Sequence, residues 1–309
     1  MKVVFMGTPD FSVSTLEEIM KAGHEVIAVV TQPDKPKGRG KSVAYPPVKE
    51  KALEYNIPVY QPVKAREESF IEILKELEPD VIVVVAFGQI LPKAILDLPK
   101  YGCINVHASL LPKYRGAAPI QWSIIGGEKV TGITTMYMDV GIDTGDMLLQ
   151  EEVSIDNDET GGSLHDKLSQ IGGKLLVETL KRLEDGTVDR IKQDDSKSNY
   201  VKMLDKALGQ IDFNKSAGEI ERLIRGLNPW PSAYTSLEDK TLKVWRARVV
   251  EGNFNGRPGE IIDLTKEEII VLTGKDALSI LELQLEGKKR MKTDEFLRGY
   301  KIDIGTILG

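Results

Sequence analysis

Apolar residues in the first third of the chain follow two alternating patterns. Short apolar runs that suit strands alternate with segments whose apolar residues fall on one face of a helix. The run at 81–87 is rich in β-branched residues and does not alternate with polar ones, which is typical of a parallel strand buried on both faces. The order predicts an α/β fold with a doubly wound, Rossmann-like parallel sheet. The expected strands are Val3–Met6, Val26–Val30, Ile57–Tyr60, Val81–Phe87 and Cys103–Val106, and the expected helices are Phe11–Ala22, Val48–Tyr55 and Glu67–Leu77.

The rest of the chain has a different pattern. Two expected strands, Ile133–Met138 and Met147–Leu149, precede a long helical stretch over Gly162–Leu183, after which Glu184–Asn199 is polar and aperiodic. A helix over Ala217–Leu227 then precedes short strands separated by glycine-containing turns, and such spacing predicts a small OB-like β-barrel. The short strands are Lys243–Val250, Glu260–Asp263, Ile269–Leu272 and Ser279–Leu285. We expect an α/β domain over residues 1–189, a linker over 190–205 and a C-terminal barrel over 206–309.

Composition narrows the class of protein. The chain has 309 residues, of which 41% are hydrophobic and 28% charged, the balance of a globular protein. Its longest apolar run, Val81–Phe87, is far below the roughly 18 residues of a membrane span, so we expect no membrane association. The single cysteine, Cys103, excludes an internal disulfide and a cysteine zinc site and favours the cytoplasm. Residues 1–195 hold 22 basic and 30 acidic residues and residues 196–309 hold 19 and 17, a weak indication of an anionic partner for the C-terminal third.

The turn after the first strand argues against a dinucleotide site. Gly7-Thr8-Pro9-Asp10 contains one glycine where a dinucleotide-binding turn has three, and Pro9 lacks a backbone N–H that a pyrophosphate would use. We expect instead a tight turn in which Asp10 or Ser12 caps the following helix.

Two polar side chains mark the end of the strand near residue 105. Asn105 and His107 are two residues apart, so in a strand both side chains point to the same face. Ligands of open α/β sheets bind at the carboxyl ends of the strands, and an amide beside an imidazole can stabilise a developing oxyanion. A histidine satisfied within the fold is the alternative for His107. The other two histidines, His24 and His165, are expected at the surface.

An acidic segment at residues 139–146 follows an expected strand. Its Gly141 and Gly145 allow positive φ, so we expect a tight loop that delivers a carboxylate, with a plain acidic turn as the alternative. The order of its acidic residues differs from that of an EF-hand. A carboxylate beside His107 would hold its tautomer and favour its charged form. Ser109 is the nearby candidate nucleophile and lacks a G-x-S-x-G setting, so we expect acyl transfer without a covalent enzyme intermediate.

These residues match a known family. The chain resembles the formyltransferases that use 10-formyltetrahydrofolate, over essentially its whole length, and most closely those members that act on a methionine esterified to tRNA. The motifs stand in the family's order and spacing. They are Gly7–Phe11, Gln32–Pro36, Gly38–Gly40, Asn105–His107, Ser109–Pro112, Arg115–Gln121, Asp139–Gly145 and Asn228–Pro231.

The resemblance implies the site and the reaction. Residues 1–189 would be the catalytic domain, and the free α-amine of methionyl-initiator tRNA would attack the formyl carbon carried by the folate, leaving tetrahydrofolate. Stabilisation of the oxyanion would come from an amide and a protonated imidazole, oriented by a carboxylate, and no metal is needed because the folate already activates the formyl group. The implied catalytic residues are Asn105, His107 and Asp143; Ser109, Leu110, Leu111 and Pro112 would contact the folate, and the switch-point rule adds Phe87, Gly88 and Gln89.

A basic loop lies between Gln32 and Pro47. It carries no acidic residue after Asp34, and its cations suit a clamp on a phosphate backbone, with a solvated basic loop as the alternative. The resemblance implies that this loop inserts at the acceptor end of the tRNA, and it places one further lysine, beyond the linker, near the bound tRNA. The implied tRNA contacts are Lys35, Lys37, Arg39, Lys41 and Lys206.

Two other functions fit parts of the sequence. One is an RNA-binding barrel with an inactive α/β domain, against which the intact trio of polar groups argues. The other is a formyltransferase for a small amine such as a sugar nucleotide, against which the basic loop around Arg39 and the barrel argue. We expect the enzyme, in the cytoplasm and as a monomer.

Overall fold

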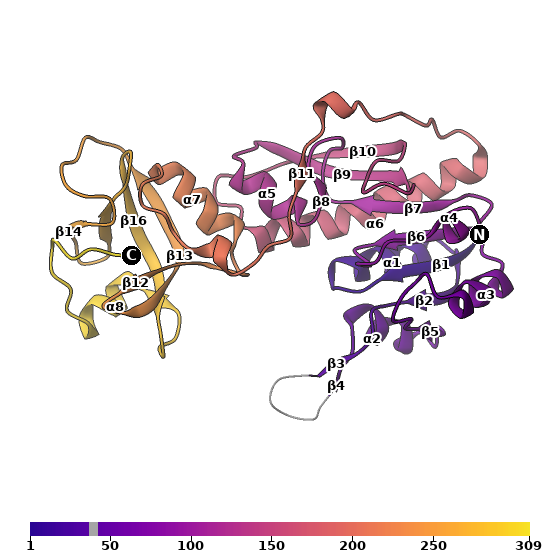
Figure 1. The fold of residues 1–309 in the computed structure, drawn as a ribbon, viewed down its shortest axis with the longest axis horizontal. Helices are drawn as coiled ribbons and strands as arrows, with labels where there is room; N and C mark the ends of the chain where they lie inside the picture. The colour runs from indigo at the N-terminus through magenta and orange to yellow at the C-terminus, as the bar shows by residue number, and fades with distance from the viewer. Residues whose placement is uncertain (37–42) are drawn as a thin grey trace. The chain divides into compact units, whose positions relative to one another are not determined.

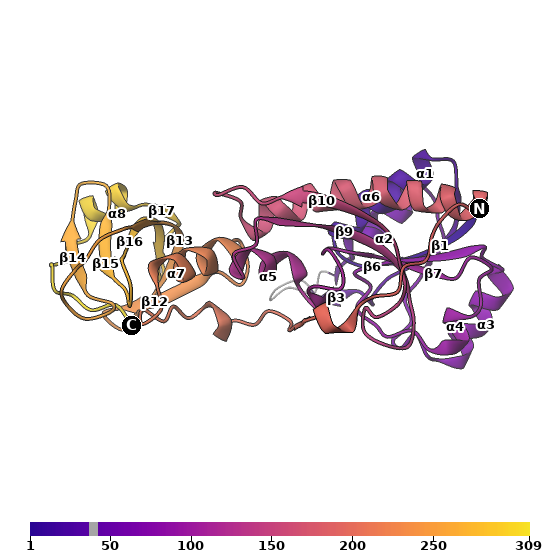
Figure 2. The same ribbon diagram turned by 90° about the horizontal axis from the view of Figure 1, so that it is seen from above.

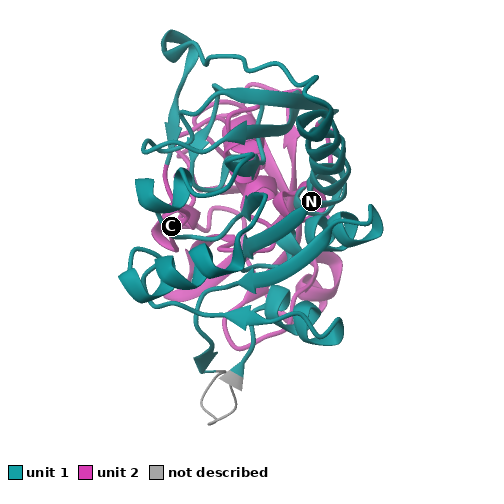
Figure 3. Ribbon diagram, turned by 90° about the vertical axis from the view of Figure 1, so that its right-hand side faces the viewer, with its two compact units in different colours: residues 1–119, 130–154, 165–201 teal, residues 120–129, 155–164, 202–309 magenta. Residues whose placement is uncertain are grey.

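A computed structural model describes residues 1–36 and 43–309, which divide into two units (Figure 3). Unit 1 comprises residues 1–119, 130–154 and 165–201, and unit 2 comprises residues 120–129, 155–164 and 202–309. The domains expected from the sequence are continuous stretches of chain, whereas these units interleave along it.

A seven-stranded sheet forms the centre of unit 1, in the order β10-β9-β7-β6-β1-β2-β5. Figure 2 shows α1 and α6 over one face of the sheet and α3 and α4 over the other. The doubly wound, Rossmann-like fold is therefore confirmed. The strands are β1 (Lys2–Gly7), β2 (Glu25–Val30), β5 (Val59–Tyr60), β6 (Val81–Val85), β7 (Cys103–His107), β9 (Val130–Tyr137) and β10 (Met147–Ser154); the helices are α1 (Phe11–Lys21), α2 (Pro47–Glu54), α3 (Glu68–Leu77), α4 (Lys93–Leu96) and α6 (Gly161–Asp185) (Figure 1).

One edge of this sheet is antiparallel, which the sequence pattern did not predict. β9 runs antiparallel to β7, with His107 opposite Thr134, and β10 runs antiparallel to β9. The connection between β9 and β10 is only residues 138–146, and a parallel pair needs a crossover of a dozen or more residues. The acidic segment is consequently a hairpin loop, with both of its ends on neighbouring strands.

The strand β6 is central to the packing of unit 1. All five of its residues are buried, and it pairs in parallel with β1 on one side and β7 on the other. Ile82 and Val84 belong to a core cluster with Leu74 of α3 and Ile95 of α4. Burial of such a side chain contributes about 1.5–3 kcal/mol.

The turn between β1 and α1 has the expected cap. The Asp10 carboxylate accepts a hydrogen bond from the Phe11 N–H at 3.0 Å. Ser12, the other expected cap, instead donates from its hydroxyl to the Val85 carbonyl at 2.6 Å. Ser12 therefore ties the start of α1 to the end of β6.

Unit 2 is built on a six-stranded antiparallel sheet with the path β12-β13-β16-β15-β14, in which β17 also pairs with β16. Helix α7 starts at a capping box formed by Ser216 and Glu219 and buries Ile220 and Ile224 in the core of the unit. The antiparallel C-terminal domain is confirmed; within the described residues no pairing joins β12 to β14 to close a barrel. The elements are α5 (Pro119–Ile125), η2 (Ala207–Gly209), α7 (Ala217–Gly226), β12 (Ala233–Leu237), β13 (Lys240–Val250), β14 (Ile261–Leu264), β15 (Ile269–Leu272), β16 (Ala277–Leu285), β17 (Met291–Lys292) and α8 (Thr293–Gly299).

The segment expected to be a linker is attached to unit 1 for much of its length. It contains η1 (Asp195–Lys197) and β11 (Tyr200–Val201), and β11 pairs in parallel with β8 (Arg115–Gly116). Within the basic loop between Gln32 and Pro47, β3 (Lys35–Pro36) and β4 (Val43–Ala44) pair as a small antiparallel ribbon. None of the helices in the described part of the chain has the length and apolar character that a membrane crossing requires.

Cys103 is a built-in probe of unit 1. Its side chain is buried on β7, and burial raises the pKa of the thiol from 9.0 to about 12, because the thiolate loses its hydration there. We predict that a thiol reagent at pH 8 does not label the native protein and labels one site per chain in denaturant. The proton stays on the folded thiol between pH 9 and 12 and leaves the unfolded one, so this group lowers the free energy of unfolding as the pH rises through that range. Equal labelling rates in native and denatured protein would contradict the prediction.

Candidate functional site

The carboxyl end of β7 presents the two polar side chains singled out in the sequence. Asn105 and His107 are 9% and 6% exposed and share one face of the strand. The Asn105 side-chain amide makes no hydrogen bond within residues 1–36 and 43–309. Because buried amides normally find a partner, this amide is available to a ligand.

His107 is held on both sides of its ring. Its Nε2 lies 2.9 Å from the Tyr114 carbonyl oxygen, and its Nδ1 lies 3.7 Å from Oδ2 of Asp143. A carbonyl only accepts, so Nε2 is the donor of this hydrogen bond. This fixes the ring and leaves Nδ1 facing the carboxylate. The structure thus brings together all three residues expected to be catalytic.

Asp143 reaches His107 from the loop between β9 and β10. The Gly116 N–H donates to its Oδ2 at 2.8 Å, which fixes the carboxylate that faces the imidazole. Asp143 itself adopts φ +54°, a conformation that aspartate tolerates better than most residues. Gly141 and Gly145 do not use the positive φ that glycine allows, because neither lies in that region.

The two glycines are needed for close approach instead. A Cβ at Gly145 would lie 1.8 Å from the Tyr137 carbonyl oxygen, and one at Gly141 would lie 2.1 Å from Oγ1 of Thr144. The Asp139 carboxylate closes the loop by accepting from the Gly141 N–H and the Thr144 hydroxyl. The loop is compact because these two positions have no side chain.

Residues 109–112 follow β7 and are fixed by their backbone. The Ser109 hydroxyl donates to the Lys113 carbonyl at 2.7 Å, so this hydroxyl already has a partner. The Leu111 N–H donates to the Thr134 hydroxyl, and the Leu111 carbonyl accepts from the Gln150 amide. Leu111 is buried, whereas Leu110 and Pro112 are half-buried.

Residues 87–89 follow β6, the neighbouring strand. Phe87 is buried and its carbonyl accepts from the Gln32 amide at 3.0 Å, while Gly88 is exposed. Gln89 binds the backbone of the 62–65 segment, accepting from the Ala65 N–H and donating to the Pro62 carbonyl. The side chain of Gln89 is therefore occupied by the protein.

The residues expected to contact RNA are only partly described. Lys35 is exposed at the base of the ribbon, and Lys206 is exposed just before η2. The base of the ribbon is anchored at Asp34, which is hydrogen-bonded to Lys49 and Gln61; the bond from Lys49 holds the pKa of its carboxyl below the usual range. Lys37, Arg39 and Lys41 lie outside the described residues.

Sequence reasoning missed two residues of this region. Arg115 is 2% exposed and donates hydrogen bonds to Gln193, Asp195 and Tyr200. Burial lowers the pKa of its guanidinium and the hydrogen bond to Asp195 raises it, and the net effect is a raised pKa. Gln193 in turn binds the loop that carries Asp143. Arg115 stood in a family motif without an assigned role. Gln193 lies in a polar aperiodic stretch, where the sequence carries no signal for it.

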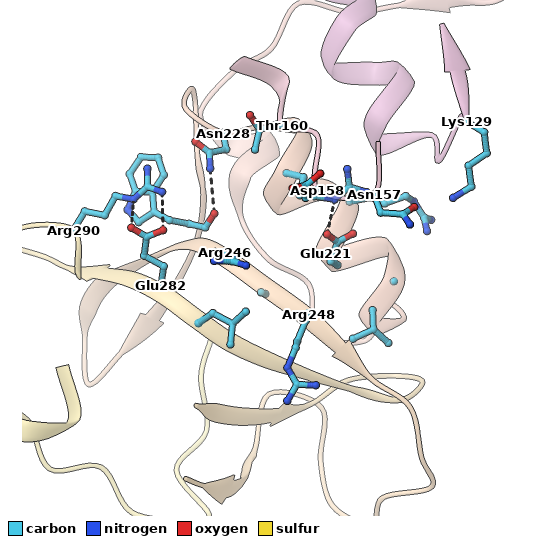
Figure 4. A pocket seen from close by; sticks show the side chains of 17 residues that line it. Lys129, Asn157, Asp158, Thr160, Glu221, Asn228, Arg246, Arg248, Glu282 and Arg290 are labelled. Carbon is cyan, nitrogen blue, oxygen red and sulfur yellow. Dashed lines mark hydrogen bonds and ion pairs between the residues drawn. The ribbon is translucent and has the colours of Figure 1, made fainter. Parts of the chain in front are cut away.

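Unit 2 contains a separate cleft of about 730 Å³ (Figure 4). Arg290 makes a two-pronged ion pair with Glu282 at 2.7 Å and stacks over the Trp245 ring, and Arg246 is exposed. The bond from Arg290 lowers the pKa of the Glu282 carboxyl. Cations outnumber anions on its lining, which includes Lys129, Arg222, Arg225, Arg246, Arg248 and Arg290 against Asp158, Glu221 and Glu282. The lining of this cleft contains no histidine, so it lacks the arrangement of amide, imidazole and carboxylate seen in unit 1.

Comparison with known proteins gives one consistent family. The sequence profile described as "Formyl transferase" matches residues 1–180, and that described as "Formyl transferase, C-terminal domain" matches residues 203–301. The chain is 61% identical to a methionyl-tRNA formyltransferase of Agathobacter rectalis, over 99% of each chain. It is 56% identical to a methionyl-tRNA formyltransferase of Clostridioides difficile, over the full length of both.

Solved structures share the fold at lower identity. An N-formyltransferase from Helicobacter canadensis, crystallised with folinic acid and dTDP-3-aminofucose, superposes with a TM-score of 0.69 at 20% identity, over 94% of this chain and 100% of that one. A sugar 3N-formyltransferase crystallised with dTDP and 5-N-formyl-THF gives a TM-score of 0.67 at 20% identity, over 94% and 99%.

The close approach at Gly145 predicts a loss of stability. Gly145→Ala would force its Cβ into the Tyr137 carbonyl, and we expect a cost of about 1–3 kcal/mol, typical of overpacking. The change in the free energy of unfolding is measured by urea titration, with labelling of Cys103 as the readout of unfolding in unit 1. Gly299→Ala is the matched control, because a Cβ there meets open space. A Gly145→Ala midpoint equal to that of the parent would mean that the loop does not approach β9 as described.

Proposed function

The chain belongs to the formyl transferase family, among the methionyl-tRNA formyltransferases, and we propose that it catalyses their reaction. It transfers the formyl group of 10-formyltetrahydrofolate to the free α-amine of methionyl-initiator tRNA, giving N-formylmethionyl-tRNA for translation initiation. The observation that carries this proposal is the 61% identity to a methionyl-tRNA formyltransferase over 99% of both chains. The grouping of Asn105, His107 and Asp143 supports it.

The proposed chemistry is a direct transfer. The amine nitrogen attacks the formyl carbon, a C–N bond forms and the carbonyl oxygen becomes negative. The bond from the formyl carbon to the folate nitrogen then breaks, and the proton lost by the amine ends on that nitrogen. No electrons are gained or lost overall, so the step needs no oxidant or reductant.

The residues of the cluster suit this transition state. The Asn105 amide has donors without a partner among the described residues, and a donor aimed at an oxyanion supplies about 3–4 kcal/mol in comparable sites. Nε2 of His107 is bound to the Tyr114 carbonyl, and Nδ1, which faces Asp143, is the ring nitrogen that we assign to the reacting groups. Asp143 provides the counter-charge at 3.7 Å and keeps the ring in place. In enzymes, catalytic contacts that are long without substrate often shorten when the substrate binds.

The formyl donor would bind along the ends of β6 and β7. Residues 109–112 present backbone groups and half-buried apolar side chains there, and 87–89 form a second wall. Since the Gln89 side chain is occupied by the 62–65 segment, we assign its part in the site to the backbone. Diffraction from crystals soaked with a stable formyl-folate analogue tests this; density away from both segments would refute it.

The RNA would contact basic surfaces on both units, each considered separately. On unit 1 these are Lys35 and the residues at 37–41, and on unit 2 they are Lys206 and the arginine-lined cleft, within the C-terminal domain that we assign to residues 206–309. Arginines suit phosphate because their planar fork donates two hydrogen bonds at once. A sugar nucleotide as acceptor is disfavoured, since the two formyltransferases described above that were crystallised with dTDP compounds are only 20% identical to this chain.

We also propose that the enzyme acts as a monomer in the cytoplasm. All three catalytic residues come from one chain, so no second copy is needed to complete the cluster. Its proposed substrates, a charged tRNA and a reduced folate, define the compartment. Sedimentation equilibrium tests the oligomeric state.

The decisive experiment is formyl transfer from radiolabelled 10-formyltetrahydrofolate to charged initiator tRNA. Label in N-formylmethionine is the expected result. Label transferred to a small amine and not to the tRNA would favour the sugar-nucleotide alternative, and RNA binding without transfer would favour a binding protein.

The trio should be required for chemistry and not for folding. We expect Asn105→Ala, His107→Ala and Asp143→Ala each to reduce the single-turnover rate about a hundredfold or more, because each removes an oxyanion donor or its orienting group. Circular dichroism and Cys103 labelling check that the variants fold. A nearly normal rate for His107→Ala would overturn the mechanism.

Salt dependence should report the RNA contacts. We expect the slope of log K against log salt to fall by about one unit for each cation removed from a phosphate contact, as in Arg246→Ala. Arg39→Lys should also be impaired and should distinguish initiator from elongator methionyl-tRNA poorly, because a lysine cannot form fork-shaped hydrogen bonds.

Arg182→Ala is the control for these variants, since Arg182 is paired with Glu178 on α6. Arg182→Ala should leave the slope of log K against log salt unchanged. The second control is folate binding, which should be normal in Arg39→Lys. If Arg39→Lys keeps the parent rate and tRNA preference, the basic loop is only a solvated surface loop and does not contribute to substrate choice.

A further inference from the structure

Gln193 sits between the loop that carries Asp143 and a buried guanidinium. Its side-chain Nε2 donates to two backbone carbonyls of the loop, those of Asp143 and Gly145, both at 2.8 Å. Its Oε1 accepts from Nε of Arg115 at 2.9 Å. Both donors and the acceptor of this amide are therefore occupied, and they join two segments far apart in the sequence.

The other side of this connection is rigid. Arg115 is 2% exposed and is held by Gln193, Asp195 and Tyr200 as well as by the pairing of β8 with β11. The next residue, Gly116, donates its N–H to the Asp143 carboxylate. β8 thus holds Asp143 twice, directly through Gly116 and indirectly through Arg115 and Gln193.

The loop has few other means of holding its position. Val140 and Ile142 at its tip are 74% and 55% exposed, so apolar burial contributes little there. The bonds of Asp139 join the loop only to itself. Asp146 at the end of the loop pairs with Arg190. Asp143 itself is joined to the rest of unit 1 by the hydrogen bonds from Gln193 and Gly116 and by its contact with His107.

We propose that Gln193 is a positioning residue for the reaction. It fixes the backbone on both sides of residue 144, and thereby sets where the Asp143 carboxylate meets His107. This inference rests on the proposed formyl transfer. A misplacement of about 1 Å in a catalytic group can cost a hundredfold in rate, so the loss of two tethers should be visible in kcat.

The sharpest variant is Gln193→Glu. It keeps the shape of the side chain and an oxygen for Arg115, but it replaces the donor to the loop by a carboxylate that repels two carbonyls. We expect kcat to fall about 10- to 100-fold with KM for the formyl donor within a factor of about three. Gln193→Ala should show the same split. Asp194→Ala, which alters a residue next to Gln193 bonded only within its own turn, should keep the parent kcat.

Two readouts separate positioning from a general structural defect. In a double-mutant cycle with Asp143→Ala, Gln193→Glu should have little further effect on kcat, because it acts through Asp143. In 15N-histidine NMR, where the chain has three histidines, the ring resonances of His107 should move while those of His24 and His165 stay. The NMR measurement does not depend on the substrate.

The outcomes are distinct. A parent enzyme without formyl transfer would refute the proposed function, and the NMR result would still test the positioning. Any of three results for Gln193→Glu would overturn the inference. They are a parent-like kcat, an effect on kcat that multiplies that of Asp143→Ala, and a His107 resonance that does not move.

Discussion

A guanidinium that is 2% exposed must be satisfied by the protein, because an unpaired buried charge costs several kcal/mol. Arg115 meets this requirement with partners drawn from residues 193–200, a stretch that the sequence pattern would leave as a free connection. The hydrogen bonds of Arg115 therefore hold residues 193–200 against unit 1. Because the same stretch contains Gln193, which binds the acidic loop, the burial of Arg115 also helps to fix the loop that carries Asp143.

The reversal of direction at one edge of the sheet has a comparable effect. Parallel strands alone deliver side chains to their carboxyl ends, as β7 does with Asn105 and His107. β9 runs antiparallel to β7 and ends beside Ile104, at the start of β7, and the loop that follows carries the Asp143 carboxylate back to His107. The cluster thus joins one strand end and one hairpin, two elements whose positions are fixed by the same hydrogen-bonded sheet.

Much of this could be predicted because it depends on local pattern. The β-branched run at 81–85, the one-face helices of unit 1, and Asn105 and His107 two apart on a strand all follow from periodicity. Three features could not be predicted in this way. They are the direction of β9 and β10, the identity of the loop residue with positive φ, and the role of Gln193. Each depends on which distant segment lies alongside, and a single polar residue in an aperiodic stretch carries no trace of its partner. Gly145 illustrates the limit: the sequence indicated a special position, and the structure gives close approach as the reason.

The chain passes from one unit to the other five times, after residues 119, 129, 154, 164 and 201. Two of the stretches in unit 2 are therefore embedded in the sequence of unit 1, and one of them contacts α7, where a Cβ at Gly226 would meet Ile125 at 2.6 Å. A gene cut at the end of unit 1 would leave the C-terminal part without these stretches. Exchange of the C-terminal domain between relatives by a single recombination event would thus break a shared core, so the two parts of this enzyme are expected to have been inherited together.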